Sequence, residues 1–285
     1  MDISDNLLDG RSVADELLAH IKSRVKKDDL NPRLDVVLVG DDAASLSYIR
    51  QKTKSADRVG IQARVHRFSS SAPAAEVADK IEELNENRAV DGIIVQLPLP
   101  DNYREQQLLE KVDPRFDVDG LNPVNFGRLL AGNPPVFYPP TPRGMIRLLE
   151  NYDLSLAGKT CVLVGMGRLV GRPLSQMLLN RDATVLCLNE FTGDLGEYTR
   201  RGDVVVAAAG VPRLLKAEHI REGAVVLDAG IHREGEELVG DVDFSPVAEK
   251  AGLITPVPGG VGPLTVAELL YNTYKSHAGE IDGNS

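Results

Sequence analysis

The chain alternates short apolar runs with segments of helical length, and this pattern limits the folds open to it. The apolar runs cover residues 34–40, 61–68, 91–100, 159–165, 183–190, 203–210 and 224–230. Amphipathic segments separate many of them, among them Ser45–Val59 and Pro73–Leu84. Neighbouring parallel strands need a crossover of about a dozen residues or more, usually a helix. The alternation therefore predicts an α/β fold built on parallel sheets.

Length and proline content divide the chain in two. With 285 residues, 42% of them hydrophobic, it can bury two separate cores. The segment Asn122–Leu130 and the proline-dense stretch Asn133–Pro142 are typical of a crossing between domains. We therefore expect one α/β domain at residues 1–138 and a second at residues 139–263.

Composition excludes several classes of partner. The net charge is −10, and no long basic run is present, so nucleic acid is excluded as a partner. No apolar run reaches the length of a membrane span, and the first residues lack the apolar core of a signal peptide. Both cysteines, Cys161 and Cys187, fall in apolar runs, as buried thiols of a reducing compartment would. These features predict a soluble, cytoplasmic protein.

One helix of the first domain carries a candidate reaction centre. Tyr48 and Lys52 are four residues apart, so they share a face of the expected helix Ser45–Val59. A phenol that stacks on a flat substrate, beside an amine that moves a proton, is typical of catalysis. Taken alone, the pair is more typical of a surface helix with a solvated lysine, and the other motifs of the chain are what favour a reaction centre.

Two further polar residues follow strand-like segments of the first domain. Gln96 comes directly after an apolar run and before two prolines, and Asp119 lies in the turn-rich segment FDVDGLNP. The carboxyl ends of parallel strands form the functional edge of a sheet, which favours a role in binding. The alternatives are an amide bonded to the backbone for Gln96 and an Asx turn for Asp119, and each is the more typical role when the residue is taken alone.

A glycine-rich loop indicates a nucleotide site in the second domain. The run 159–165 leads into Gly165-Met166-Gly167-Arg168, then Val170 and Gly171, and a helical segment follows. Such a loop lets a pyrophosphate approach the backbone and the helix N-terminus. Its spacing is G-x-G-x-x-x-G, which is also compatible with a tight turn that binds nothing. The histidines are scattered without metal-ligand spacing, so we predict no metal site.

The order of these motifs argues against one familiar enzyme class. In short-chain dehydrogenases the glycine loop opens the chain and the Tyr/Lys pair follows, whereas here the pair comes first. A non-catalytic nucleotide-binding module is the other alternative. It would not need Lys52, Gln96 and Asp119 on the functional edge of the first domain.

The sequence resembles the bifunctional methylenetetrahydrofolate dehydrogenase/cyclohydrolase (FolD) family over nearly its whole length. The matching segments are VGDDAASLSYIRQK, DGIIVQLPLP, DVDGLNPVNFGRL, PPTPRG, VGMGRLVGRP and ITPVPGGVGPLTVAELLYNT. The resemblance implies oxidation of 5,10-methylenetetrahydrofolate and hydrolysis of the methenyl product to 10-formyltetrahydrofolate, within one-carbon metabolism and purine biosynthesis. It also implies a homodimer, a Rossmann-like second domain, an active site in the cleft between the domains, and a last helix (264–278) that completes the first domain.

The resemblance assigns roles to individual residues. It implies that Tyr48 stacks on the folate, Lys52 is the catalytic amine, Gln96 supports Lys52, and Asp119 holds the pterin. Further expected substrate contacts are Leu97, Pro258, Gly259 and Gly260. The expected cofactor contacts are Gly165, Met166, Gly167, Arg168, Val170, Gly171, Glu190, Ala209, Gly210 and Ile231.

The cofactor is where family and residues diverge. The family default is NADP, but several family positions are changed here, namely Phe116, Pro140, Met166, Asn189 and Glu190. Glu190 is expected beside the adenosine ribose, where a carboxylate accepts hydrogen bonds from a 2′-hydroxyl and repels a 2′-phosphate. We therefore expect NADP as the cofactor, with NAD as the alternative.

Overall fold

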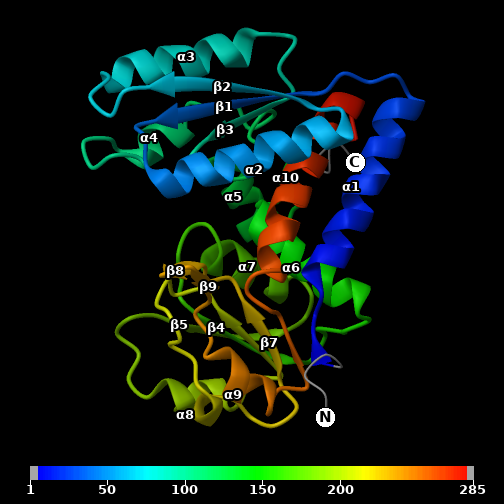
Figure 1. Cartoon of the computed structure of the whole chain (residues 1–285), viewed down its shortest axis with the longest axis vertical. Coiled ribbons are helices and arrows are strands. Elements are labelled where there is room, and N and C mark those ends of the chain that lie inside the picture. Colours follow the sequence, from blue (N-terminus) through cyan, green and yellow to red (C-terminus); the bar gives the residue numbers. More distant parts are fainter. Residues whose placement is uncertain (1–5, 281–285) are drawn as a thin grey trace. The chain divides into compact units, whose positions relative to one another are not determined.

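The structure is a computed structural model that describes residues 6–280 and divides into two compact units (Figure 1). Of the described residues, the three-stranded unit comprises 15–140 and 266–280, and the five-stranded unit comprises 6–14 and 141–265. The segment Asn122–Leu130, expected at a crossing, lies inside the three-stranded unit, where Pro123–Leu130 form helix α5. The unit boundary comes at the start of helix α6 (Pro140–Asn151).

The three-stranded unit contains a parallel sheet of order β2-β1-β3. The strands are β1 (Arg33–Val39), β2 (Gln62–Phe68) and β3 (Gly92–Val95). β1 is central and buried along its whole length, as its continuous apolar run predicts. The helices are α2 (Ala43–Val59), α3 (Ala74–Glu86), α4 (Glu105–Leu109), α5, and most of α1 (Gly10–Lys27) and α10 (Val261–Ala278).

Residues at both ends of helix α2 determine where it begins and ends. The Asp42 carboxylate accepts a hydrogen bond from the backbone N–H of Ser45 at 2.8 Å, which caps the first turn. The helix ends at Gly60, whose φ of 85° suits glycine and lets its N–H reach the last carbonyls. The buried residues Ser45, Ile49, Ala56 and Val59 form one stripe of α2, and by helical spacing Lys52 lies in the same stripe, with Tyr48 beside it.

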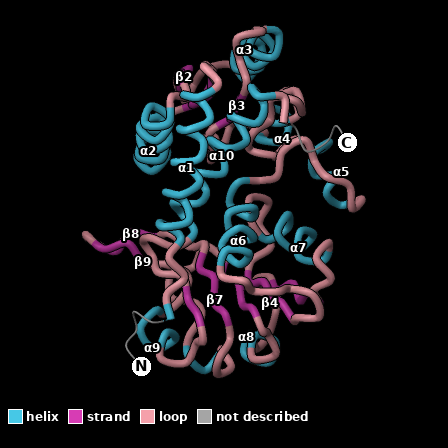
Figure 2. Tube along the Cα trace, turned by 90° about the vertical axis from the view of Figure 1, so that its right-hand side faces the viewer, coloured by secondary structure: helices cyan, strands magenta, loops and turns pink. Residues whose placement is uncertain are grey.

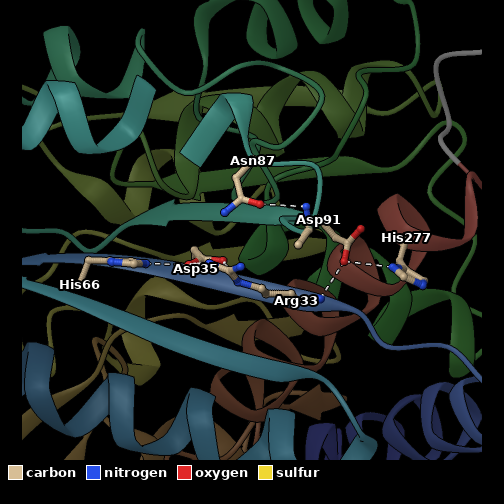
Figure 3. Close-up of polar contacts among 7 residues, drawn as sticks. Arg33, Asp35, His66, Asn87, Asp91 and His277 are labelled. Atoms are coloured by element: carbon tan, nitrogen blue, oxygen red, sulfur yellow. Dashed lines mark hydrogen bonds and ion pairs between the residues drawn. The ribbon is translucent and has the colours of Figure 1, made fainter. Parts of the chain in front are cut away.

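Charged residues hold together the end of this sheet at which β1 and β3 begin (Figure 3). The buried Asp35 carboxylate pairs with Arg33 at 2.7 Å and with His66 Nε2 at 2.6 Å. Asp91 accepts the Arg33 backbone N–H at 2.7 Å and pairs with His277 of α10 at 3.0 Å. Because Asp91 precedes β3 whereas Gln96 follows it, this network lies at the opposite end of β3 from the candidate site.

The five-stranded unit contains a parallel sheet of order β10-β7-β6-β4-β5. Its strands are β4 (Thr160–Val164), β5 (Thr184–Leu188), β6 (Val204–Ala207), β7 (Val225–Asp228) and β10 (Leu253–Ile254). The chain leaves β4 to one side to form β5 and returns to form β6 on the other side. Ligands of open α/β sheets bind at such a reversal of strand order, here between β4 and β6.

Besides α6 and the first residues of α1 and α10, the described part of this unit contains four helical segments and one hairpin. They are α7 (Gly171–Leu179), α8 (Leu195–Thr199), a 3₁₀ turn (Ala217–His219), α9 (Phe244–Ala248), and the antiparallel pair β8 (His232–Glu234) and β9 (Glu237–Val239). In Figure 2 the hairpin extends away from the five-stranded sheet. The prediction of an α/β fold with parallel sheets is confirmed, although no sequence pattern indicated the hairpin.

One local expectation, that both cysteines are buried, is corrected. Both cysteines are free thiols, but only Cys161 is buried. Cys187 is exposed because β5 is the outer strand of its sheet and its side chains are only partly covered. Helix α6 begins at Pro140, and the Thr141 hydroxyl in its first turn pairs with the Thr265 hydroxyl at 2.9 Å. Within residues 6–280, no helix is long and apolar enough to cross a membrane.

Candidate functional site

The structure brings Lys52 and Gln96 together at the carboxyl end of β3. Lys52 Nζ donates to Gln96 Oε1 at 3.1 Å. The Gln96 amide is oriented by a second hydrogen bond, because its Nε2 donates to the Leu97 carbonyl at 2.6 Å. That bond leaves Oε1 as the atom facing Lys52. The amide is thus held to the backbone, as the alternative for Gln96 required, and it also contacts the lysine.

The charge state of this centre follows from its surroundings. Burial lowers the pKa of Lys52 from 10.5, and the Asp119 carboxylate opposes that shift. Burial raises the pKa of Asp119, and the Lys52 ammonium partly offsets the rise. The two groups therefore interact electrostatically inside the three-stranded unit. Tyr48 lies on α2 one turn before Lys52 and keeps 36% of its surface exposed, so part of its ring is available to a flat ligand.

A tight loop carries Asp119. Gly120 follows it with a φ of 63°, and a Cβ there would lie 2.7 Å from the Pro139 nitrogen. Only glycine combines this backbone conformation with so close an approach. The loop is also tied to α10, because Asn272 Nδ2 donates to the carbonyls of Val118 and Tyr138, both at 2.9 Å.

The sequence reasoning missed Asp117, which organises this loop. Its buried carboxylate accepts the backbone N–H groups of Leu121 at 3.2 Å and Asn122 at 2.8 Å, and Asn125 Nδ2 at 2.8 Å. Asp117 thus serves the turn, a role that had been the alternative for Asp119. Burial raises the pKa of Asp117 to about 7, although these three hydrogen bonds act in the opposite direction. The available signal was the pair of acidic residues before a glycine.

The glycine loop of the five-stranded unit joins β4 to α7. A Cβ at Gly165, whose φ is 101°, would overlap with the Ala208 carbonyl, and one at Gly171 would overlap with the Gly165 carbonyl. A Cβ at Gly167 would meet nothing within 4 Å, so the backbone there is open to a ligand. Close packing at two glycines and an open third fit the approach of a pyrophosphate to the helix N-terminus.

The other expected cofactor residues follow neighbouring strands. Glu190 is exposed in a turn after β5, where Asn189 Oδ1 accepts the Phe191 N–H at 3.1 Å. Ala209 and Gly210 follow β6, and Ile231 follows β7 and is 44% exposed. Met166 and Arg168 lie in the glycine loop itself, and the Met166 carbonyl accepts a hydrogen bond from Arg172 at 3.0 Å. Leu188, which ends β5, is buried.

The expected substrate residues fall in both units. Tyr48, Lys52, Gln96, Leu97 and Asp119 belong to the three-stranded unit. Pro258, Gly259 and Gly260 belong to the five-stranded unit, in the loop between β10 and α10. Gly259 has a φ of 117°, and its carbonyl accepts the Arg11 N–H at 2.9 Å. Within residues 6–280, no group of three or more His, Cys, Asp or Glu side chains could hold a metal ion.

Comparison with known families accounts for both units. The model described as "Tetrahydrofolate dehydrogenase/cyclohydrolase, catalytic domain" matches residues 8–119. The model described as "Tetrahydrofolate dehydrogenase/cyclohydrolase, NAD(P)-binding domain" matches residues 139–280. The chain is 45% identical to the bifunctional protein FolD of Hydrogenobaculum sp., over 95% of this chain and 98% of that protein.

Solved structures agree with these matches. The bifunctional enzyme FolD of Campylobacter jejuni superposes with a TM-score of 0.94 and 41% identity, covering 96% of this chain and 99% of that one. The methylenetetrahydrofolate dehydrogenase-cyclohydrolase of Trypanosoma brucei, solved with NADP and an inhibitor, gives a TM-score of 0.90 and 33% identity. That alignment covers 95% of this chain and 97% of the Trypanosoma chain.

Proposed function

This chain belongs to the tetrahydrofolate dehydrogenase/cyclohydrolase family, and we propose how its own side chains carry out the two reactions of that family. It is a bifunctional enzyme of one-carbon metabolism. It oxidises 5,10-methylenetetrahydrofolate to the methenyl compound and hydrolyses that compound to 10-formyltetrahydrofolate. Neither a short-chain dehydrogenase nor a non-catalytic nucleotide module is favoured, because both halves of the chain match domains of this one family.

Lys52 is the acid/base group of the hydrolysis. Water adds to the methenyl carbon and one carbon–nitrogen bond then opens, so a proton must leave the water and another must reach the departing nitrogen. A lysine with a lowered pKa can accept and return such protons. The 3.1 Å hydrogen bond to the oriented Gln96 amide is the observation that carries this assignment. It fixes Nζ while leaving the amine's lone pair free for the proton.

The neighbouring residues orient the folate. Asp119 accepts hydrogen bonds from the donor edge of the pterin, and its charge is favoured by Lys52. Tyr48 stacks on the flat part of the substrate with its partly exposed ring. Leu97, Pro258, Gly259 and Gly260 are the further substrate contacts in this proposal. Ground-state orientation matters for both reactions, because a misplaced ring slows proton and hydride transfer alike.

A nicotinamide cofactor fits the residues of the five-stranded unit. The cradle at Gly165, Gly167 and Gly171 would hold its pyrophosphate at the start of α7, where backbone N–H groups and the helix dipole favour an anion. The remaining contacts in this proposal are Met166, Arg168, Val170, Glu190, Ala209, Gly210 and Ile231. When bound, the cofactor supplies the acceptor for the hydride that leaves the substrate.

The enzyme uses NADP and discriminates only weakly against NAD. The family and its NADP-bound Trypanosoma relative support NADP. Glu190, exposed after β5, acts against a 2′-phosphate because like charges repel. We expect kcat/KM for the two cofactors to differ by less than about tenfold, a gap of about 1.4 kcal/mol. A preference for NADP above about a hundredfold would show that Glu190 does not face the ribose.

One assay tests the proposed activities together. Purified protein is given methylenetetrahydrofolate with NADP or NAD, and the absorbance of methenyltetrahydrofolate is followed. Its appearance reports the dehydrogenase, and its decay, measured separately from supplied methenyltetrahydrofolate without cofactor, reports the cyclohydrolase. Absence of both signals would refute the proposal.

The family resemblance also leads us to propose a cytoplasmic homodimer. Light scattering tests the oligomeric state by mass, and a monomer at assay concentration would contradict the homodimer.

A further inference from the structure

One fully buried carboxylate of the five-stranded unit has no place in the mechanism so far. Asp241 follows the β8–β9 hairpin and has no exposed surface. Its Oδ2 accepts two consecutive backbone N–H groups, from Ala209 at 2.6 Å and Gly210 at 2.8 Å. Its Oδ1 lies 2.7 Å from His232 Nε2. A buried carboxylate is costly unless its oxygens are satisfied, and here both oxygens have donors.

The two N–H groups that Asp241 accepts lie beyond the end of strand β6, where no neighbouring strand pairs with the chain. β6 ends at Ala207, and the last ladder bond of this segment runs from Ala208 N–H to the Val164 carbonyl at 2.8 Å. Beyond it, Ala209 and Gly210 have no strand partner for their N–H groups. The carboxylate therefore replaces the missing ladder and fixes the turn after β6.

Asp241 also contacts the loop after β7 and acts indirectly on the glycine loop. A Cβ at Gly230 would overlap with the Asp241 carboxylate, so the backbone after β7 packs directly on it. A Cβ at Gly165 would overlap with Ala208, so the glycine loop packs on the segment that Asp241 fixes. One side chain thus sets the spacing of the loops after β4, β6 and β7.

A second buried carboxylate fixes Asp241 itself. Asp228, which ends β7, accepts the N–H of Asp241 at 3.0 Å through Oδ1 and that of Val242 at 2.9 Å through Oδ2. Burial raises the pKa of Asp228 to about 6, and the nearby Asp241 carboxylate acts in the same direction. The segment after the hairpin is therefore anchored on the end of β7, not on the hairpin alone.

We propose that Asp241, supported by His232, is a positioning residue for the nicotinamide cofactor, because it presets the backbone of Ala209 and Gly210 against the glycine loop. The inference rests on the proposed assignment of Ala209, Gly210 and Ile231 to the cofactor. Asp241 does not touch the cofactor in this inference. It takes the N–H groups of Ala209 and Gly210 and so fixes the backbone of the two residues assigned to the cofactor. Preorganised loops bind more tightly because less ordering is left to occur on binding.

The test compares Asp241→Ala with Asp241→Asn. The alanine variant removes the acceptor of two N–H groups, so we expect KM and Kd for NADP to rise roughly 10- to 100-fold. The asparagine variant keeps an oxygen for the loop, and its amide can donate to His232 in the other tautomer, so it should recover most of that loss. Cyclohydrolase activity, assayed without cofactor, should stay within about twofold of wild type, because Lys52 and Gln96 belong to the other unit.

Each outcome decides the inference. Unchanged cofactor affinity in a folded Asp241→Ala protein would overturn it. The inference would also be overturned if the alanine variant lost dehydrogenase and cyclohydrolase activity equally and the asparagine variant lost as much as the alanine variant. If the alanine variant does not fold, His232→Leu and His232→Gln replace it. Leucine should weaken NADP binding and glutamine should not, because only glutamine donates to Oδ1; equal effects would overturn the inference. A wild type that binds neither NADP nor NAD would instead refute the proposed function.

Discussion

Replacement of Lys52 by methionine separates the two reactions most sharply. Methionine keeps an unbranched stem of similar length but cannot carry a proton. Lys52 Nζ makes one hydrogen bond, to Gln96 at 3.1 Å, and interacts with Asp119 through charge. Loss of a general acid/base typically costs about 10²- to 10⁴-fold in rate, or about 2.7–5.4 kcal/mol of transition-state stabilisation. We expect the cyclohydrolase to fall by that amount.

The dehydrogenase should suffer less. Hydride transfer moves no proton to Lys52, so only substrate orientation is disturbed, and we expect a loss of less than about tenfold. Both activities are measured on the same preparation, together with the melting temperature. Lys54→Met is the matched control, because Lys54 lies on the same helix, two residues further along, and is exposed.

The pH profile adds an independent check. Because burial lowers the pKa of Lys52, the neutral amine becomes populated below the ordinary lysine range. Wild-type hydrolysis should therefore rise with pH toward a midpoint below 10.5, and Lys52→Met should lose that dependence. Near-normal hydrolysis in the variant, or an equal fall in both activities, would refute the acid/base assignment.

Three further predictions concern the residues around this centre and the cofactor. Asp119→Ala should weaken folate binding by about 1.5–3 kcal/mol with an unchanged melting temperature, and unchanged affinity would return Asp119 to a turn-forming role. Glu190→Ser should shift kcat/KM toward NADP, and an unchanged ratio would contradict its place beside the ribose. Burial raises the folded-state pKa of Asp117 from 3.8 to about 7, so the contribution of Asp117 to the free energy of unfolding falls as pH rises from about 4 to about 7. The melting temperature plotted against pH over that range should fall less steeply for Asp117→Asn than for wild type. An identical slope would exclude Asp117 as a source of this pH dependence.

The sequence by itself determined the features that depend on local geometry. The alternation of apolar runs and helical segments predicts parallel α/β sheets, because only a crossover can join parallel strands. Tyr48 and Lys52 share a helix face because residues four apart always do. The glycine loop was recognisable because a strand, three glycines and a helix follow one another in the chain. Its packing against Ala208 was not, since that residue lies on another strand.

Only the tertiary structure decided which distant groups meet. The orientation of the Gln96 amide depends on the Leu97 carbonyl, and a sequence does not show which face of an amide is bonded. Cys187 is exposed because β5 is an outer strand, and strand order is not written in an apolar run. Asp241 accepts a hydrogen bond from Ala209, 32 residues away in the chain, and the hairpin between them was not predicted by any sequence periodicity. Local patterns specify elements, whereas the partners of a buried polar group are fixed only when the strands are ordered and the loops between them close.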